Sequence, residues 1–136
     1  MLSIRSTAAM THALTLPLDP ILRAVLLRRR SQLTDHYDHD LGDLANFLIV
    51  QEGDAATEVE AELGFSILTN FVDGRRFDDP DFTPSWEWLE DHGGWFELVF
   101  VLTDDGFGWV LFVEDRPGTD PELLALCHAH SVKTTS

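Results

Sequence analysis

The sequence has one cysteine, few basic side chains and no long apolar run. Cys127 is the only cysteine among 136 residues, so a disulfide within the chain is excluded. A helix that crosses a bilayer needs about 20 apolar residues, and no run in the chain approaches that length. Residues 1–18 also lack the apolar stretch of about 7–15 residues that a signal peptide requires. These absences predict a cytoplasmic protein that does not associate with membranes.

Basic residues are scarce and unevenly placed. The chain has 9 Lys and Arg against 24 Asp and Glu, a formal net charge of −15. Residues 1–33 contain five arginines and one aspartate, whereas residues 34–136 contain four basic and 23 acidic residues. Binding to nucleic acid depends on Lys and Arg releasing phosphate counterions, so direct nucleic-acid binding is not expected. An acidic body of this kind favours a basic protein partner.

What the chain does contain is enough apolar sequence for one core. The hydrophobic fraction is 44%, with nine Phe and four Trp. A chain of this length most simply forms one domain. We expect a flexible N-terminal tail at residues 1–18, a single α+β domain at 19–131 and a C-terminal tail at 132–136.

Capping residues and apolar spacing predict four helices. Asp19-Pro20 and Asp120-Pro121 each place a capping aspartate before a proline at the first helical position. Gly53-Asp54 precedes a third apolar-periodic run that Gly64 closes, and Ser85 precedes a short acidic run. The predicted helices cover residues 20–33, 55–63, 86–91 and 120–130.

Two strand-like runs joined by Asp104-Asp105-Gly106 predict a central hairpin, 95–103 and 107–114. Side chains alternate along the first run, with Phe96 and Leu98 on one face and Trp95 and Val99 on the other. Both faces are mostly apolar, so we expect the hairpin to be covered on both sides. Residues 46–51 predict another buried strand, although a helix beginning near Asp40 also fits. An extended segment at 65–71 is expected too. The fold class is therefore α+β, with an antiparallel or mixed sheet and packed helices.

Residues 35–40, Asp-His-Tyr-Asp-His-Asp, are the most metal-like segment. His36 and His39 are three residues apart, and Asp38 lies between them; imidazole and carboxylate suit first-row metals. The pattern lacks further ligands at a recognised spacing, and aspartates of this kind are common in turns. No cofactor is expected, and no catalytic motif is present.

Aromatic and acidic residues are interleaved between Phe77 and Trp95. Aromatic anchors within an acidic rim are typical of a protein-binding surface, although the same aromatics could fill the core. The predicted binding residues are Asp78, Asp79, Asp81, Trp86, Trp88, Glu90 and Asp91.

The sequence ranks three functions. A non-enzymatic protein-binding or inhibitory module, resembling in its charge an immunity protein or nucleic-acid mimic, comes first. A small enzyme using His36, Asp38, His39 and His92, with or without a metal, is the second. The third is a subunit of a homo-oligomer or larger complex, because helices of this size need not cover both apolar faces of the hairpin.

Overall fold

The computed structural model describes residues 1–34, 45–63, 85–101 and 108–133. Its strands form one six-stranded mixed sheet in the order β1-β2-β5-β4-β3-β6. The strands are β1 (Leu2–Ile4), β2 (Ala45–Val50), β3 (Ser85–Asp91), β4 (Trp95–Val101), β5 (Gly108–Glu114) and β6 (Val132–Lys133). The helices are α1 (Thr7–Ala13), α2 (Pro20–Thr34), α3 (Ala56–Leu63) and α5 (Pro121–His130). This is the predicted α+β class with a mixed sheet.

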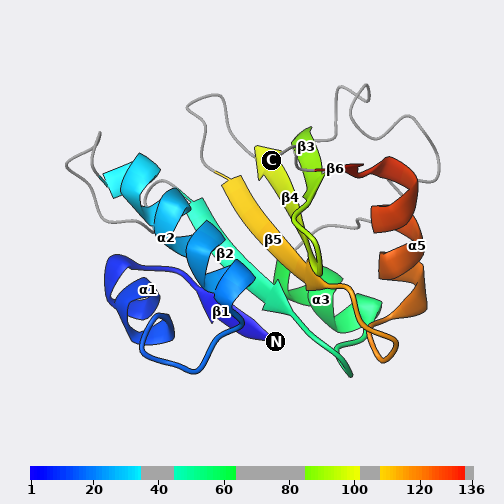
Figure 1. Ribbon diagram of the computed structural model, residues 1–136, viewed down its shortest axis with the longest axis horizontal. Helices are drawn as coiled ribbons and strands as arrows, with labels where there is room; N and C mark the ends of the chain where they lie inside the picture. The colour runs from blue at the N-terminus through cyan, green and yellow to red at the C-terminus, as the bar shows by residue number, and fades with distance from the viewer. Residues whose placement is uncertain (35–44, 64–84, 102–107, 134–136) are drawn as a thin grey trace.

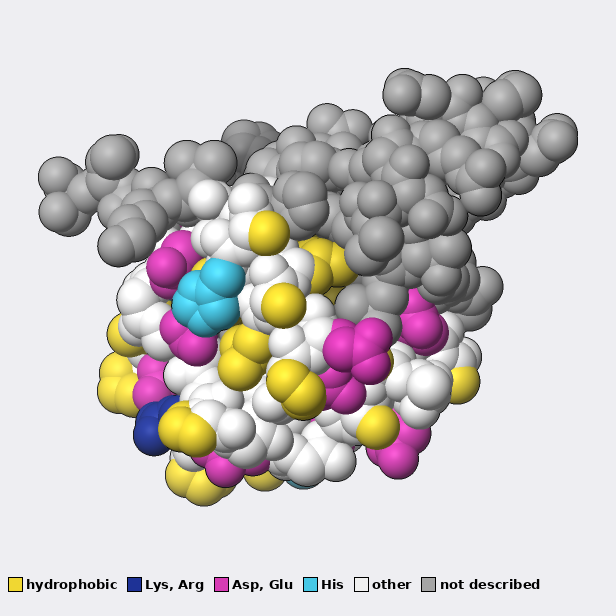
Figure 2. Space-filling model, turned by 90° about the vertical axis from the view of Figure 1, so that its right-hand side faces the viewer, with side chains coloured by type: hydrophobic (Ala, Val, Ile, Leu, Met, Phe, Trp, Pro, Cys, Tyr) yellow, Lys and Arg dark blue, Asp and Glu magenta, His cyan; other side chains and the backbone are white. Residues whose placement is uncertain are grey.

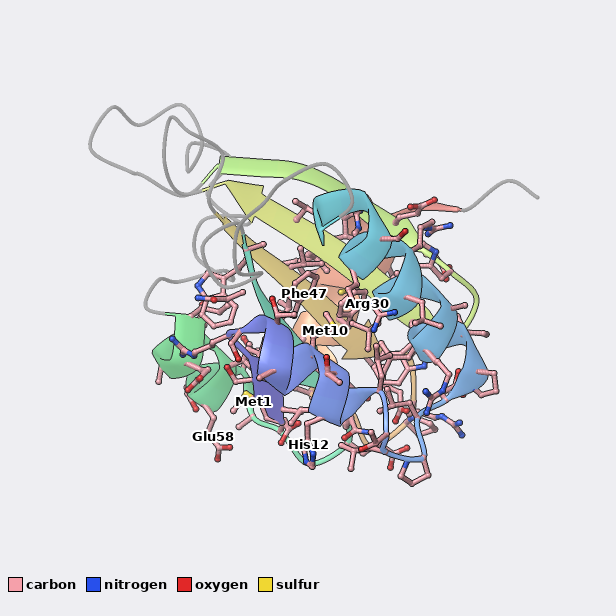
Figure 3. The ribbon with its side chains drawn as sticks, turned by 90° about the vertical axis from the view of Figure 1, so that its left-hand side faces the viewer. Met1, Met10, His12, Arg30, Phe47 and Glu58 are labelled. Carbon is pink, nitrogen blue, oxygen red and sulfur yellow. The ribbon has the colours of Figure 1, made fainter. Side chains whose placement is uncertain are left out.

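Helices cover both faces of the sheet. The helices α1 and α2 lie on one face, and α3 and α5 lie on the other (Figure 1). On the α1/α2 face, Met10 and Phe47 belong to one buried cluster between helices and strands (Figure 3). On the opposite face, Val59 and Cys127 from the helices pack with Phe96 and Leu111 from the strands. The predicted burial of both strand faces is therefore confirmed.

The centre of the sheet is formed by β2, β5 and β4. The strand β2 runs parallel to β5, with Phe47 opposite Val110, and β5 runs antiparallel to β4, with Leu111 opposite Leu98. A strand buried on both faces has apolar residues at consecutive positions, as residues 47–50 do. The strand reading of this segment is confirmed over the helix that competed with it. Residues 102–107, which include the predicted turn, lie outside the described residues.

The predicted helix at residues 86–91 is wrong, because this segment is strand β3. It pairs antiparallel with β4, from Ser85 opposite Val101 to Asp91 opposite Phe96, with a shift of register between Trp86 and Trp88. Backbone pairing along a ready-made apolar strand outweighs the weak helical preference of a short acidic run. The residues of β4 that pair with this segment lie about 5 to 16 positions further along the chain. The local signal, Ser85 before a short acidic run, therefore did not indicate a strand.

The predicted tails are also corrected. Residues 2–4 form β1, which pairs with the edge of β2, and Ser6 caps α1 by accepting a hydrogen bond from the Ala9 backbone N–H. Ile4, Met10 and Ala13 are buried, so this segment closes the α1/α2 face of the core. At the other end, β6 pairs parallel with β3, so the predicted tail at 132–136 begins with two strand residues. The apolar residues of the N-terminal segment are too widely spaced to predict a helix or strand from the local sequence. Their positions depend on tertiary contacts with β2 and the core.

The other predicted helices agree with the structure within a residue or two at their ends. Helices expected at 20–33, 55–63 and 120–130 are α2, α3 and α5. None of the described helices combines the length and apolar character needed to cross a membrane. The expected extended segment at 65–71 lies outside the described residues.

Candidate functional site

The strand β4 carries a glutamate within an otherwise apolar layer. Glu97 is fully buried, and its neighbours across the sheet in the same row are Phe112 on β5 and, beyond it, Ile49 on β2. It shares the α1/α2 face of the strand with Trp95 and Val99. A carboxylate buried in such surroundings is costly unless other groups bind it. The contacts of Glu97 therefore define the site.

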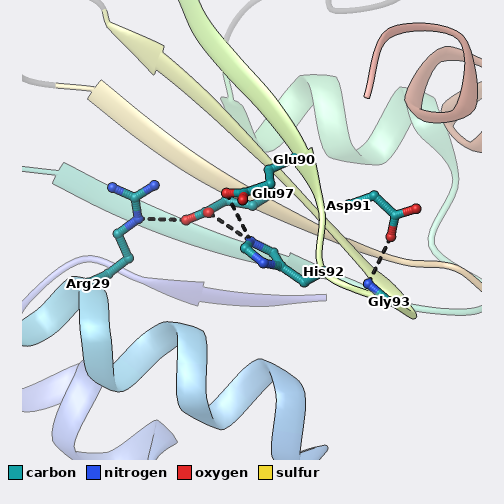
Figure 4. Close-up of polar contacts among 6 residues, drawn as sticks. All are labelled: Arg29, Glu90, Asp91, His92, Gly93 and Glu97. Atoms are coloured by element: carbon teal, nitrogen blue, oxygen red, sulfur yellow. Dashed lines mark hydrogen bonds and ion pairs between the residues drawn. The ribbon is translucent and has the colours of Figure 1, made fainter. Parts of the chain in front are cut away.

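Arg29 reaches Glu97 from the helix above the sheet. Its Nε donates to Glu97 Oε2 at 2.6 Å, and the arginine side chain is only 17% exposed (Figure 4). A charge-assisted hydrogen bond of this length is among the stronger polar interactions in proteins. It joins α2 to β4 across the layer between helix and sheet.

A tight turn brings His92 to the other oxygen of Glu97. The two residues between His92 and Trp95 are Gly93 and Gly94, with φ of +84° and +108°, as a two-residue hairpin turn of the primed type requires. The His92 backbone N–H donates to the Trp95 carbonyl at 2.8 Å, and Asp91 Oδ1 accepts from the Gly93 N–H at 2.8 Å. These bonds fix the backbone position of His92, which directly follows β3.

His92 Nε2 faces two carboxylates. It lies 3.0 Å from Glu97 Oε1 and 3.7 Å from Glu90 Oε2 (Figure 4). Glu90 stands opposite Glu97 in the β3–β4 register, so the two carboxylates project from adjacent strands on one face. The imidazole is 5% exposed and Glu90 is 32% exposed, so the group reaches the surface on the Glu90 side. We call Glu90, His92 and Glu97 the carboxylate–imidazole cluster.

The charge of Glu97 is maintained by its partners. Burial by itself raises the pKa of this carboxyl, but the hydrogen bond and positive charge of Arg29, together with the His92 hydrogen bond, outweigh it. The pKa of Glu97 is therefore below its ordinary value, and the side chain is ionised at neutral pH.

The carboxylate–imidazole cluster is also the set of potential metal ligands in the described part of the chain. One ligand atom from each of the three residues lies within 4.8 Å of the others. An imidazole with carboxylates can bind a divalent cation, or can transfer a proton between nitrogen and oxygen. Either chemistry would use groups supplied by two adjacent strands and one turn.

A second feature is an acidic surface on and between α3 and α5. The segments before the two helices meet, since the Gly53 N–H donates to the Gly118 carbonyl and Asp120 caps both helices. Residues 51–63 and 114–130 contain nine acidic residues and one arginine, and none of the nine carboxylates is buried. The acidic surface comprises Glu52, Asp54, Glu58, Glu60, Glu62, Glu114, Asp115, Asp120 and Glu122.

Figure 2 shows the side of the molecule that carries α5. Acidic side chains recur across its described part, and Lys or Arg occurs at one place. Within the acidic surface, Glu62 pairs with Arg5 at 2.6 Å, and this bond lowers the pKa of Glu62. Burial raises the pKa of Glu114, with Glu52 and Asp19 adding repulsion against the attraction of Arg116. The surface thus concentrates like charge.

The predicted binding residues are only partly described. Asp78, Asp79 and Asp81 lie outside the described residues, and only the backbones of Trp86 and Trp88 are placed, in β3. The other two predicted residues, Glu90 and Asp91, lie in the cluster and at its turn. Trp95, at the end of the same stretch, is buried in the core.

The metal-like residues His36, Asp38 and His39 lie outside the described residues. Of the four candidates for the enzyme alternative, the structure places His92, and it joins His92 to two residues that the sequence did not connect with it. Glu97 and Arg29 were missed as site residues. A single glutamate at an alternating position in an apolar strand was the available signal, because such a residue needs a buried cation nearby.

The cysteine of the chain, Cys127, is a core residue. Its side chain is fully buried between α5 and the sheet. Burial raises the thiol pKa far above its ordinary value, with repulsion from Asp115 and Asp91 adding to it. A thiol in this state is a poor nucleophile.

Comparison of the chain with protein-family models, curated proteins and solved structures finds no match.

Proposed function

We propose that this protein is a non-enzymatic binding module that docks a basic protein partner through its acidic surface. The observation that carries the proposal is the separation of charge between the two sides of the sheet. The acidic surface has nine carboxylates on the α3/α5 side. The other side carries the four arginines of α2, whereas Arg5, which follows β1, pairs with Glu62 of the acidic surface.

Charge of one sign on one side has a physical consequence for association. Complementary potentials steer a partner toward the matching surface and reject partners of like charge. Because α3 and α5 also pack against a dense apolar cluster, the carboxylates stand on two supported helices. A supported surface loses less conformational entropy on binding than a flexible one.

The predicted binding residues stay part of this proposal. Trp86 and Trp88 would supply aromatic anchors, and the acidic rim around them would comprise Asp78, Asp79, Asp81, Glu90 and Asp91. Acidic helices alone supply steering, and buried aromatic contacts supply most of the affinity in protein interfaces. An inhibitory role of the kind that immunity proteins or nucleic-acid mimics perform belongs to the same proposal, since both classes bind basic partners through acidic surfaces.

The alternative of a homo-oligomer loses its original support. That alternative required an uncovered apolar face on the central strands, and the chain's own helices cover both faces within the described residues. The large hydrophobic residues exposed among them are Met1, Ile21 and Leu27.

The test compares two variants with equal net charge. Glu58→Gln/Glu122→Gln removes two exposed charges from the acidic surface, and Ala8→Lys/Ala24→Lys adds two exposed charges on α1 and α2. Immobilised full-length proteins are used to capture partners from a lysate of the source organism at low and at high salt, and the captured protein is then purified. Its affinity for each variant is measured by calorimetry.

We expect to recover a basic partner. Its affinity should fall at least about tenfold for Glu58→Gln/Glu122→Gln and much less for the control, and high salt should weaken its binding to the wild type. Equal losses for the two variants would show only a nonspecific net-charge effect. Failure to recover a basic protein at low salt would contradict the proposal.

A further inference from the structure

The carboxylate–imidazole cluster lies apart from the acidic surface, on the α1/α2 side of the sheet, and none of its three residues belongs to that surface. We propose that Glu90, His92 and Glu97 bind one divalent first-row transition metal ion, with Zn²⁺ as the best-fitting ion to test. The three ligand atoms already lie within 4.8 Å of one another.

Geometry favours a single ion held by all three groups. Zinc binds His nitrogen and carboxylate oxygen at about 2.0–2.2 Å, so neighbouring ligand atoms around it lie about 3–3.6 Å apart. His92 Nε2 is 3.0 Å from Glu97 Oε1 and 3.7 Å from Glu90 Oε2, which brackets this range. Small rotations of the half-exposed Glu90 carboxylate would complete the site.

Donor chemistry narrows the class of metal. Calcium and magnesium prefer sites made only of oxygen ligands, whereas one imidazole nitrogen with carboxylate oxygens suits zinc and its neighbours in the first row. A divalent ion at this position can bind the imidazole nitrogen and both carboxylates at once.

The supports of these ligands are characteristic of metal sites. Arg29 holds the second oxygen of Glu97 at 2.6 Å, which orients the carboxylate and leaves Oε1 directed at His92. Outer contacts of this type fix ligand orientation and contribute to metal affinity. The ligands stand on β3, β4 and a turn with two glycines at positive φ, and so on elements fixed by backbone pairing.

Charge is consistent with a cation. Glu90 and Glu97 each supply a carboxylate, the negatively charged ligand type that a divalent cation binds. Zinc sites with three protein ligands also keep a position for water or another ligand. That open position is what the metal-assisted enzyme alternative would require.

The experiment uses the full chain, stripped with a chelator and titrated with ZnCl₂ by calorimetry near neutral pH. We expect one saturable site per chain. His92→Gln and Glu90→Gln should each weaken it by at least about tenfold while circular dichroism stays unchanged. Co²⁺ substitution should give visible absorption bands in the wild type that the His92→Gln variant lacks.

Two controls separate this site from other histidines. His36→Gln/His39→Gln tests the segment that the sequence made metal-like, and His128→Gln removes an exposed histidine 3.3 Å from Asp115. Both should bind Zn²⁺ as the wild type does. Loss of binding in the His36→Gln/His39→Gln variant with retention in His92→Gln would overturn the proposal. Absence of saturable binding to the wild type would also overturn it.

Discussion

At the residue scale, a single buried carboxylate sets the electrostatics of the sheet. Glu97 lies opposite Phe112 in a buried row of the sheet. An apolar residue in place of Glu97 would carry no cost of burying a charge. Its ionised form persists because Arg29 and His92 bind both oxygens. Removing one partner of a buried pair is more damaging than the pair is stabilising.

We expect Glu97→Gln to lower the free energy of unfolding by about 3 kcal/mol at neutral pH, because it removes the buried carboxylate that both Arg29 and His92 bind. The folded-state pKa of Glu97 is below the unfolded value, so its stabilisation is present above about pH 4.3 and is lost as the pH falls through the folded pKa. Urea unfolding across this range should therefore show the two proteins converging in acid.

Arg29→Met/Glu97→Gln is the matched control, because it removes both charges. We expect the double variant to be more stable than Glu97→Gln alone. A difference between wild type and Glu97→Gln that does not vary with pH would contradict the assignment.

Asp120 shows a second residue with more contacts than its sequence position indicates. It caps α5 through the Glu122 and Leu123 backbone N–H groups, as predicted, and its other oxygen accepts from the Ala56 N–H of α3 at 2.9 Å. Gly53-Asp54 precedes α3 in the sequence, but the Asp54 carboxylate accepts from the Gln51 N–H.

Asp120→Ala should destabilise the protein by about 2 kcal/mol, since one cap is worth about 1 kcal/mol and two helices lose theirs. Asp19→Ala is the control, because Asp19 Oδ1 accepts from the Ile21 N–H of one helix only. Thermal unfolding of both variants measures the ratio. Equal losses would show that the contact with α3 contributes nothing.

At the element scale, β3 and its turn to β4 hold the cluster together. The strand exists because its backbone pairs with β4, and its end is set by two glycines in the left-handed region. A side chain at either glycine meets no atom within 4 Å, so a substitution there costs backbone strain and no collision.

Gly93→Ala should therefore cost about 1–2 kcal/mol, the typical penalty for placing an ordinary side chain in this region. Gly93→Asn should cost clearly less, because asparagine adopts positive φ more readily. Chemical denaturation of the two variants tests this order. Equal stability of Gly93→Ala and wild type would contradict a turn that depends on positive φ.

At the scale of the whole molecule, charge is segregated while apolar contacts are shared evenly. Two apolar clusters lie on opposite faces of one sheet. The acidic surface, in contrast, lies on one side, in a chain with a net charge of −15. Self-repulsion of this size weakens the folded state at low salt.

Raising NaCl from about 0.01 M to about 0.5 M shortens the Debye length from about 30 Å to a few ångströms, so we expect Tm to rise by several degrees. The Glu58→Gln/Glu122→Gln variant should show a smaller rise, because two of the repelling charges are gone. Differential scanning calorimetry gives both values. A Tm that falls with salt would mean that ion pairs outweigh repulsion.

The sequence by itself determined the features that depend on neighbouring residues. Aspartate-proline starts predicted α2 and α5, and runs of apolar residues predicted the strand at 46–51 and the burial of both faces of the runs at 95–103 and 107–114. Each of these rests on local chemistry or on a periodicity of a few residues, which the chain expresses wherever it folds.

Only the tertiary structure decided the features that need partners far along the chain. Segment 86–91 is a strand because β4 pairs with it. Residues 2–13 form β1 and α1 because they pair with β2 and pack against the core. The cluster needs His92 and Glu97 from a turn and a strand, with Arg29 contributed by α2, 68 residues before Glu97. No local pattern encodes such a meeting, because it depends on which elements pack together, and packing is set by the whole chain.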